Sequence, residues 1–261
     1  MDVPKDWELP EYEEYCFKPK SSDYCITIPV LNEMGKIDVQ LRKMEELCPG
    51  WDIIICDGGS TDGCEDPDFM KGLNVRTLLI KTGPGRMSAQ QRIMFAYGLS
   101  EGYAGIINVD GNNKDGVEAI PEYIRLLKSG YGSVYGSRYL PGGTHKNTPI
   151  ERELAIRFFH APLISLGARF RYTDTTNSFR GYSREFMQDP KVKPFRDVFD
   201  NYNLPYYLAV RAPRLGYKVI EIPVSRVYPD HGDTPTKITG LRSKLKIIKE
   251  LLMATFGMYN P

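Results

Sequence analysis

The sequence predicts an α/β fold, a mostly parallel central sheet with helices on both of its faces. Three observations lead to this prediction. Apolar runs of strand length alternate with segments of helical periodicity through the first half of the chain. These runs are almost continuously apolar, as expected of strands that are buried on both faces of a parallel sheet. Several of them end abruptly in polar residues and glycine, which marks the end of a strand.

The same patterns place the individual elements. Strands are expected near residues 24–30, 52–57, 74–80, 104–109 and 131–136, with helical segments between them. One of these helices should begin at about Arg86, after Gly83-Pro84-Gly85. The second half is less regular, and we expect a helix near 150–166, a short strand near 178–182, a helix near 202–214 and a strand near 218–224.

Composition indicates one globular domain with a full core. The chain has 261 residues, of which 41% are hydrophobic and 26% charged. The net charge of +1 gives no overall basic field, so no nucleic-acid partner is implied. No apolar run approaches the roughly 20 residues that span a bilayer, and residues 1–6 lack a signal-peptide core. We therefore expect a cytoplasmic protein.

The cysteines and histidines suggest no metal centre. The five cysteines have no paired metal-ligand spacing, and their odd number argues against a secreted disulfide framework. We expect most of them to be small buried hydrophobic residues. The three histidines are scattered along the chain, and none is assigned to a metal.

The most informative segment is 106–112, where an apolar run ends in Asn108, Asp110 and Asn112. Alternate oxygen-bearing residues at the end of a strand can hold a hard divalent cation. The same residue types are common in turns, so an ordinary turn is the alternative.

Two earlier strands end in the same way. The run at 52–57 leads into Asp57-Gly-Gly-Ser-Thr-Asp62, and the run at 24–30 leads into Leu31-Asn32-Glu33. Ligands of open parallel sheets bind outside the carboxyl ends of the strands. These polar clusters should therefore converge on one crevice.

Gly83-Pro84-Gly85 does not mark a nucleotide fingerprint. It lacks the Gly-Lys-Ser/Thr ending of a P-loop and the third glycine of a dinucleotide-binding loop. A turn is the simpler interpretation. The sequence therefore gives little support for a P-loop kinase or a nicotinamide-dependent enzyme.

Taken in order, the motifs resemble family 2 of the glycosyltransferases. They are Ile28-Pro-Val-Leu-Asn-Glu33, Asp57-Gly-Gly-Ser-Thr-Asp62-Gly63, Asn108-Val-Asp-Gly-Asn112, Gly136-Ser-Arg-Tyr139, Asp174-Thr-Thr-Asn-Ser-Phe-Arg180 and Gly216-Tyr-Lys-Val-Ile-Glu-Ile-Pro-Val224. The last two make the chain most similar to the dolichyl-phosphate mannose synthase branch. The resemblance implies a GT-A fold that binds a nucleoside-diphosphate sugar, with the acceptor side in the C-terminal half.

The resemblance also implies a domain division. It gives an N-terminal extension at 1–23, a GT-A domain at 24–238 and a C-terminal amphipathic helix at 239–261. The membrane-spanning segments of some relatives are missing from this sequence, so a polyprenyl-phosphate acceptor is not assumed.

For the nucleoside, the resemblance implies contacts from Glu33 and Asp57, with Pro29 and Val30 packing on the base. A carboxylate at Asp57 can accept the imide N–H of uracil or the N–H groups of guanine. The alternative for Asp57 is a helix N-cap or an Asx turn that supports the two glycines after it.

For the metal, the resemblance implies that Asp110, with Asn108 and Asn112 beside it, holds Mg²⁺ or Mn²⁺ against the diphosphate. The family pattern has an aspartate where this chain has Asn108, so the site carries one negative charge fewer. Asn108 is also a candidate contact to the nucleotide, through the ribose or the sugar.

For the acceptor and the diphosphate, the resemblance implies four basic residues. Arg138 occupies a position that faces the acceptor phosphate in the lipid-linked branch, and its alternative is a salt bridge. Arg180 is expected to bind an anionic acceptor or to pair with Asp174. Arg226 and Lys237 flank a turn-rich segment resembling a loop that closes over the diphosphate.

Asp174 and Asp200 are the candidate general bases. A hydroxyl acceptor needs a base, whereas a phosphate oxygen is already anionic near neutral pH. Asp174 is equally suited to capping the turn at Thr175 and Thr176.

The C-terminal segment is expected to form an amphipathic helix. Its apolar face consists of Leu241, Leu245, Ile248, Leu252 and Phe256, and its basic residues lie elsewhere. Such a helix can lie on the inner face of an anionic membrane as a peripheral contact. The alternative is that its apolar face packs on the domain or on a second subunit in a homodimer, and we favour this alternative.

These features predict a metal-dependent inverting glycosyltransferase. It would move a sugar from a UDP- or GDP-linked donor to a phosphate or hydroxyl acceptor, in surface polysaccharide or glycolipid assembly. The alternatives are a polyprenyl-phosphate hexose synthase at the membrane surface and a noncatalytic nucleotide-sugar-binding protein. A nucleotidyltransferase would need a glycine-rich loop after the first strand, where this chain has Leu31-Asn-Glu-Met34.

Overall fold

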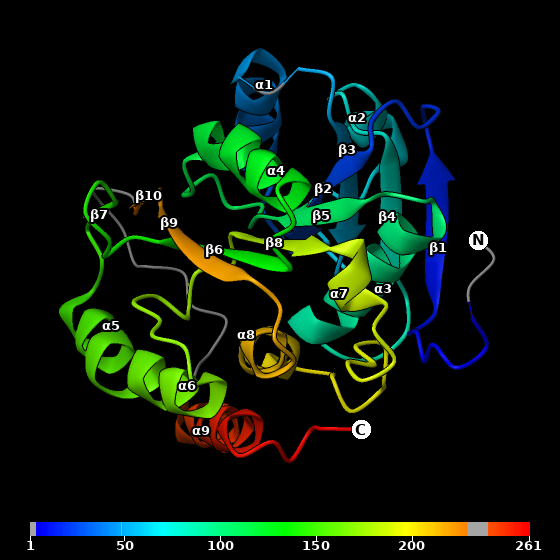
Figure 1. Cartoon of the computed structure of the whole chain (residues 1–261). Helices are drawn as coiled ribbons and strands as arrows, with labels where there is room; N and C mark the ends of the chain where they lie inside the picture. Colours follow the sequence, from blue (N-terminus) through cyan, green and yellow to red (C-terminus); the bar gives the residue numbers. More distant parts are fainter. Residues whose placement is uncertain (1–3, 48, 229–239) are drawn as a thin grey trace.

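An eight-stranded sheet forms the centre of the computed structural model, which describes residues 4–47, 49–228 and 240–261 (Figure 1). In spatial order the strands are β1 (Tyr12–Cys16), β4 (Thr77–Lys81), β3 (Asp52–Asp57), β2 (Tyr24–Val30), β5 (Gly105–Asn108), β8 (Arg180–Ser183), β6 (Ser133–Ser137) and β9 (Val219–Pro223). Only β1 and β8 pair antiparallel to their neighbours in this sheet. The predicted mostly parallel sheet is confirmed.

Helices cover both faces of the sheet, and each face has its own hydrophobic core. One face carries α1 (Ile37–Leu47), α2 (Pro67–Lys71) and α4 (Ile120–Lys128). The other carries α3 (Met87–Ser100), α6 (Ala161–Ala168), α7 (Arg184–Met187), α8 (Asn203–Arg214) and α9 (Gly240–Thr255). Every residue of β2 and of β3 is buried, as the apolar runs predicted for central parallel strands.

Smaller elements border this core. A 3₁₀ turn (Val117–Ala119) precedes α4, and a two-stranded parallel sheet joins β7 (Thr144–Lys146) to β10 (Ser225–Val227). The predicted helix near 150–166 is one run made of α5 (Ile150–Ala155), a π-helical turn (Ile156–His160) and α6.

The structure adds strands that the sequence patterns did not reveal. β1 pairs with β4 at the edge of the sheet, inside the segment 1–23 that was predicted to be an extension. Its sequence, Tyr-Glu-Glu-Tyr-Cys, is polar because an edge strand is partly exposed. β7 and β10 were missed because three residues are too few to show a periodic pattern.

Candidate active site

The carboxyl ends of β3, β2 and β5 lie at one edge of the sheet. β2 is the middle strand, with Val30 paired to Asp57 of β3 and Thr27 paired to Asn108 of β5. Gly111 approaches the same end of β2, because a Cβ added to it would lie 2.9 Å from Val30 Cγ2. At a strand spacing of about 4.8 Å, the ends of β3 and β5 are roughly 10 Å apart. The polar clusters therefore converge.

Asp57 closes the turn after β3. Its Oδ1 accepts hydrogen bonds from the backbone N–H of Gly59 at 2.7 Å and of Ser60 at 2.8 Å, and its Oδ2 accepts the Ser60 hydroxyl. The side chain is fully buried. This arrangement is the Asx turn that the sequence left open, and the nucleoside contact of Asp57 stays a prediction.

Glu33 lies in the loop after β2, which is tied to the Asp57 turn. The backbone N–H of Asn32 donates to Ser60 Oγ, and the backbone N–H of Thr61 donates to Asn32 Oδ1, both at 2.9 Å. Glu33 itself forms an ion pair with Lys36 at 2.7 Å. The two loops are thus one connected unit at the sheet edge.

Gln90 of α3 joins the ends of β2 and β3 from the other face. Its Nε2 donates to the carbonyl oxygens of Val30 and Cys56, both at 3.0 Å. Pro29 and Val30 are buried beneath this contact. Gln90, which the sequence analysis did not single out, therefore holds the strand ends on which the nucleotide base is predicted to pack.

The loop after β5 carries three side-chain oxygens without a partner. The Oδ1 atoms of Asn108, Asp110 and Asn112 are buried and accept no hydrogen bond from the described residues. The amide of Asn108 is oriented by its Nδ2, which donates to Ser178 O at 2.8 Å. Buried oxygens of this kind cost free energy until a donor or a cation binds them.

These residues fit a divalent metal. One carboxylate oxygen and two amide oxygens are the hard ligands that Mg²⁺ and Mn²⁺ prefer. The backbone of the loop is also braced, because Gln40 of α1 donates to Asp110 O at 2.9 Å and accepts from Asn113 N–H at 2.7 Å. A metal-binding loop needs such support to keep its ligands in place.

Arg226 of β10 lies beside this loop. Its guanidinium donates to Asp115 Oδ2 at 2.5 Å and to Asp110 Oδ2 at 3.1 Å. Burial alone would lower the pKa of Arg226, but the carboxylates of Asp115 and Asp110 raise it well above its usual value. Arg226 is therefore a fixed positive charge next to the candidate metal ligands. It belongs to β10 and not to the turn-rich segment that was predicted to close over the diphosphate. Lys237 lies outside the described residues.

Arg138 and Asp174 form a buried pair. Arg138 Nε and Nη2 donate to Asp174 Oδ2 at 2.6 Å and Oδ1 at 3.0 Å, and the two side chains are at most 2% exposed. Arg138 Nη2 also donates to Thr176 Oγ1 at 2.9 Å. Burial would raise the pKa of Asp174, but the hydrogen bonds and charge of Arg138 outweigh it and lower that pKa. Asp174 thus has the salt-bridging, turn-capping environment of a structural residue.

Arg180 is enclosed by backbone carbonyl groups. Its guanidinium donates to the oxygens of Asn177 at 2.8 Å, Pro205 at 2.6 Å and Thr175 at 2.6 Å, and the residue is 3% exposed. The alternative of a pair with Asp174 is wrong, because these carbonyls take its donors. A direct contact to an acceptor has little room here.

His160 stands behind the same loop. Its Nδ1 lies 2.7 Å from Thr175 Oγ1, and its ring packs edge-on against Tyr206 at 4.9 Å between centroids. Burial, reinforced by the charge of Arg180, lowers the pKa of His160 to about 4. The imidazole is therefore neutral at physiological pH.

Asp200 lies beside a pocket that we call the cationic pocket, because its ion-pair partner Lys246 lines that pocket. The pocket has a volume of about 510 Å³ and is lined chiefly by Arg86, Tyr202, Arg242, Leu245, Lys246 and Lys249. Asp200 is half exposed and forms an ion pair with Lys246 at 3.5 Å. Burial, and then the charge of Asp110, raises the pKa of Tyr202, while Arg86 opposes this. The pocket therefore brings four cationic side chains, those of Arg86, Arg242, Lys246 and Lys249, together with one phenol group.

Several of these groups were missed in the sequence. Gln40 gave a signal that could have been used, because it is a polar residue within the buried stripe of α1. Gln90, Asp115 and Tyr202 gave none, since their roles depend on segments far away in the chain.

A neighbouring acidic group has a different role. Asp62, Cys64 and Glu65 lie within 4.8 Å of one another by their ligand atoms. The carboxylates of Asp62 and Glu65 accept backbone N–H groups of their own and the neighbouring loop. We therefore read this group as loop structure.

Comparisons with known proteins agree with the family resemblance that the sequence motifs predicted. No protein-family profile matches the chain. The polyprenol monophosphomannose synthase of Mycolicibacterium smegmatis is 24% identical over 237 residues, which cover 86% of this chain and 85% of that protein. The undecaprenyl-phosphate mannosyltransferase of Micrococcus luteus is 24% identical over 211 residues, which cover 79% of this chain and 84% of that protein. The predicted resemblance to this branch of family 2 is confirmed.

Solved structures show the same fold. The glucosyl-3-phosphoglycerate synthase of Mycobacterium tuberculosis, in complex with Mn²⁺, uridine diphosphate and phosphoglyceric acid, superposes with a TM-score of 0.60. The match covers 91% of this chain and 84% of that chain at 16% sequence identity. Its complex with phosphoglyceric acid gives a TM-score of 0.61. The predicted GT-A fold is confirmed.

No helix in the described part of the chain is both long enough and apolar enough to span a membrane.

Proposed function

We propose that this chain, a glycosyltransferase with the GT-A fold and a homologue of the polyprenyl-phosphate mannose synthases, moves a hexose from a nucleoside-diphosphate sugar to a phosphate-bearing acceptor. The donor is UDP- or GDP-linked, the transfer depends on Mg²⁺ or Mn²⁺ and inverts the anomeric centre, and the product enters surface polysaccharide or glycolipid assembly. Inversion is carried over from family 2.

The observation that carries this proposal is the set of three buried oxygens, on Asn108, Asp110 and Asn112, that have no partner among the described residues. They would hold the cation, and a bound cation would act as a Lewis acid on the leaving diphosphate. Arg226 adds a fixed positive charge next to them, on the side of Asp110. The site has less negative charge than the family pattern, because Asn108 replaces an aspartate and Arg226 adds a positive charge. A site with so little negative charge favours a ligand that carries its own phosphate groups.

The nucleoside end of the donor would lie over β2 and β3. The turn of Asp57 and the loop of Glu33 are joined by hydrogen bonds, so they would move together or not at all. We retain both carboxylates, with Pro29 and Val30, as the proposed nucleoside site. Lys237 stays a proposed contact to the diphosphate.

We favour a phosphate acceptor because both candidate bases, Asp174 and Asp200, are engaged in ion pairs. Asp174 is bonded to Arg138 through both oxygens and its pKa is lowered, and Asp200 is paired with Lys246. An anionic phosphate oxygen needs no base to attack the sugar, whereas a hydroxyl does. The relatives named above act on polyprenyl phosphates, and the structural neighbour binds phosphoglyceric acid, an acceptor that also carries phosphate.

We place this acceptor in the cationic pocket rather than on Arg138 and Arg180. Arg86, Arg242 and Lys249 all line this pocket, together with Tyr202. Arg138 and Arg180 instead use their donors inside the protein. Their proposed part is to position the loop 174–180 that borders the site.

The test is Mn²⁺ binding by electron paramagnetic resonance, with and without UDP or GDP. Asp110→Asn keeps the size of the side chain and removes its charge, so we expect Mn²⁺ affinity to fall at least tenfold, since changing even a residue that only supports a ligand typically costs 10–100-fold. Asp23→Asn, an exposed carboxylate before β2, is the control and should bind as the wild type does. Unchanged affinity in Asp110→Asn would remove the metal role.

Turnover is measured separately with radiolabelled UDP-glucose and GDP-mannose and a polyprenyl phosphate or phosphoglyceric acid. Transfer that needs Mn²⁺ or Mg²⁺ supports the proposal. Nucleotide-sugar binding with no transfer to either acceptor would favour the noncatalytic binding protein, the alternative that Asn108 keeps open.

We also infer a peripheral membrane contact through α9. The apolar residues Leu245, Ile248, Leu252 and Phe256 are 36–67% exposed, while Glu250 and Leu251 are buried. The expectation that this stripe packs on the domain is therefore wrong for its described side chains, since the opposite side of the helix packs. An exposed apolar stripe with Lys244 and Lys249 nearby suits an anionic membrane surface.

A further inference from the structure

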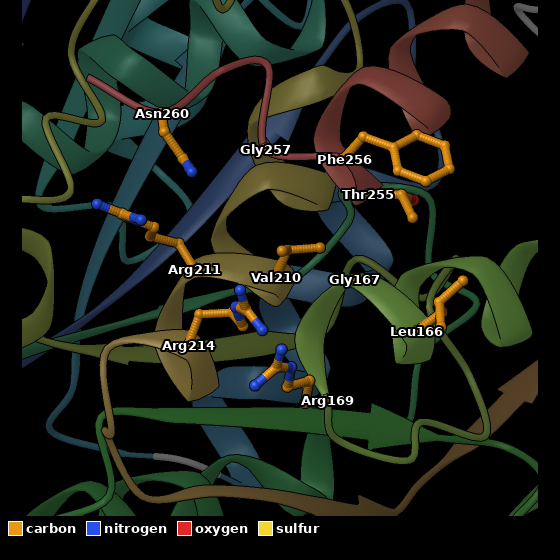
Figure 2. A pocket seen from close by; sticks show the side chains of 10 residues that line it. All are labelled: Leu166, Gly167, Arg169, Val210, Arg211, Arg214, Thr255, Phe256, Gly257 and Asn260. Atoms are coloured by element: carbon orange, nitrogen blue, oxygen red, sulfur yellow. The ribbon is translucent and has the colours of Figure 1, made fainter.

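A second cavity lies at the far end of α9, between the carboxyl ends of α6, α8 and α9 (Figure 2). Its volume is about 510 Å³, and its polar lining is provided mainly by Arg169, Arg211, Arg214 and Asn260. The cationic pocket is lined by residues 242–249 of α9, whereas this cavity is lined by 255–257. At 1.5 Å per helical residue, the two cavities are roughly 15 Å apart along the helix.

The arginine side chains of this cavity lack counter-charges. Among the described residues, the guanidinium groups of Arg169 and Arg214 make no hydrogen bond or ion pair, and no acidic residue lines the cavity. Arg211 is partly engaged, because its Nε and Nη2 donate to Lys191 O at 3.0 and 2.7 Å. Figure 2 shows Arg169 and Arg214 reaching into the same space. Positive groups that share a cavity repel each other unless an anion lies between them.

Helix capping does not account for these arginines. Basic residues are common at the carboxyl ends of helices, where they bond the last carbonyl groups. At the ends of α8 and α9 the backbone takes such carbonyls: Leu215 N–H donates to Arg211 O, and the N–H groups of residues 256–258 donate to carbonyls of 252–254. Within the part of the chain that the structure describes, Arg169 and Arg214 form no such bond, so their donors remain available.

The backbone at Arg169 is also unusual. It ends α6 in the left-handed conformation, at φ 54°, a position that normally takes glycine or asparagine. An arginine there costs free energy in the backbone and places a guanidinium at the cavity.

We propose that this cavity binds a phosphate group through Arg169, Arg214 and Arg211. The planar guanidinium matches the geometry of phosphate oxygens and can donate two hydrogen bonds at once. The ligand is a phosphate monoester or diester, separate from the donor and acceptor of the transfer reaction.

The rim of the cavity indicates a lipid as the carrier of this phosphate. Leu166 and Phe256 line it and are 68% and 67% exposed. Phe256 continues the exposed stripe of α9, and Met258, 68% exposed, follows it. No acidic residue occurs in 155–173, and the only one in 240–261 is Glu250, which is buried. An anionic headgroup in the cavity would place its acyl chains beside these apolar residues.

The test compares Arg169→Gln/Arg214→Gln with the matched control Arg171→Gln, an exposed arginine of the same segment that does not line the cavity. One arm measures binding of inorganic phosphate by calorimetry. The other measures cosedimentation with phosphatidylcholine vesicles that do or do not contain phosphatidic acid. Since the two arginines make no hydrogen bond or ion pair with residues 4–47, 49–228 or 240–261, the double variant should keep the wild-type Tm.

We expect the double variant to lose at least about tenfold in affinity for phosphatidic acid vesicles, and the control to stay within about twofold of wild type. Loss in both arms supports a phosphate site that accepts either source, and loss in the vesicle arm alone supports a lipid headgroup. Binding that is equal in all three proteins, or absent from wild type in both arms, overturns the proposal. Transfer to a soluble acceptor should be unchanged in the double variant, so this result is independent of the proposed function.

Discussion

Replacing Asp174 by asparagine should destabilise the fold rather than only stop the chemistry. The substitution keeps the shape of the side chain but removes the charge that Arg138 faces at 2.6 and 3.0 Å. Arg138 is 2% exposed and would remain charged even without Asp174, because a guanidinium is effectively always protonated in proteins. The variant therefore leaves a buried cation without its counter-charge.

The expected magnitude follows from that burial. Removing one partner of a buried ion pair costs about 3–5 kcal/mol. In a domain of this length, each kcal/mol lowers the Tm by about 2–4 °C, so Asp174→Asn should lower it by roughly 10 °C. Arg138→Met combined with Asp174→Leu removes both charges, and should recover most of the lost stability.

Thermal and urea unfolding of the three proteins, together with a pH series, measure this. The pKa of Asp174 is lower in the folded protein than in the unfolded chain, so its contribution is present above about pH 4 and disappears as the pH falls through the folded pKa. Asp174→Asn should lack this acid-dependent part. An Asp174→Asn protein with the wild-type Tm and a collapsed kcat would refute the reasoning and restore Asp174 as a base.

Three further changes test the surroundings of the site. Gln40→Ala removes the brace of the Asp110 loop and leaves the backbone groups of Asp110 and Asn113 without it, so it should weaken Mn²⁺ binding about tenfold, measured by paramagnetic resonance, and lower the Tm by a few degrees. Gly58→Ala brings a Cβ within 2.8 Å of Gln90 Nε2, so it should cost about 1–3 kcal/mol in urea unfolding. The pKa of His160 is lowered to about 4, so its contribution is complete above about pH 6.5 and is lost as the pH falls toward 4; His160→Gln should remove an acid-dependent loss of roughly 3 kcal/mol.

The sheet could be predicted because its signal is local. The runs that became β2, β3 and β5 are apolar at consecutive positions, and burial on both faces requires this of any central parallel strand. The segment that became β1 gave no such signal, since an edge strand needs only one buried face. Its place in the sheet depends on β4, more than 60 positions later.

The candidate site was predictable where it follows from the ends of strands. Asp57 and Asp110 each come directly after an apolar run, and parallel strands carry such positions to one edge. The lining of the cationic pocket was not predictable in this way. It combines the start of α3, the loop before α8 and the exposed side of α9, which are neighbours only after the chain has folded.

The binding partners of the arginines could not be predicted from the sequence. Arg138 was assigned to the acceptor phosphate from its place in a family motif and the shape of the guanidinium, and Arg180 was assigned to an anionic acceptor or to Asp174. That chemistry is equally suited to an internal carboxylate or to a ring of carbonyl oxygens, and the fold supplies one to each. Arg169 and Arg214 belong to no motif, yet they line a cavity and donate to none of the residues that the structure describes. The partner, rather than the residue type, decides whether an arginine can take a ligand, and partners 36 positions apart are fixed only by the tertiary fold.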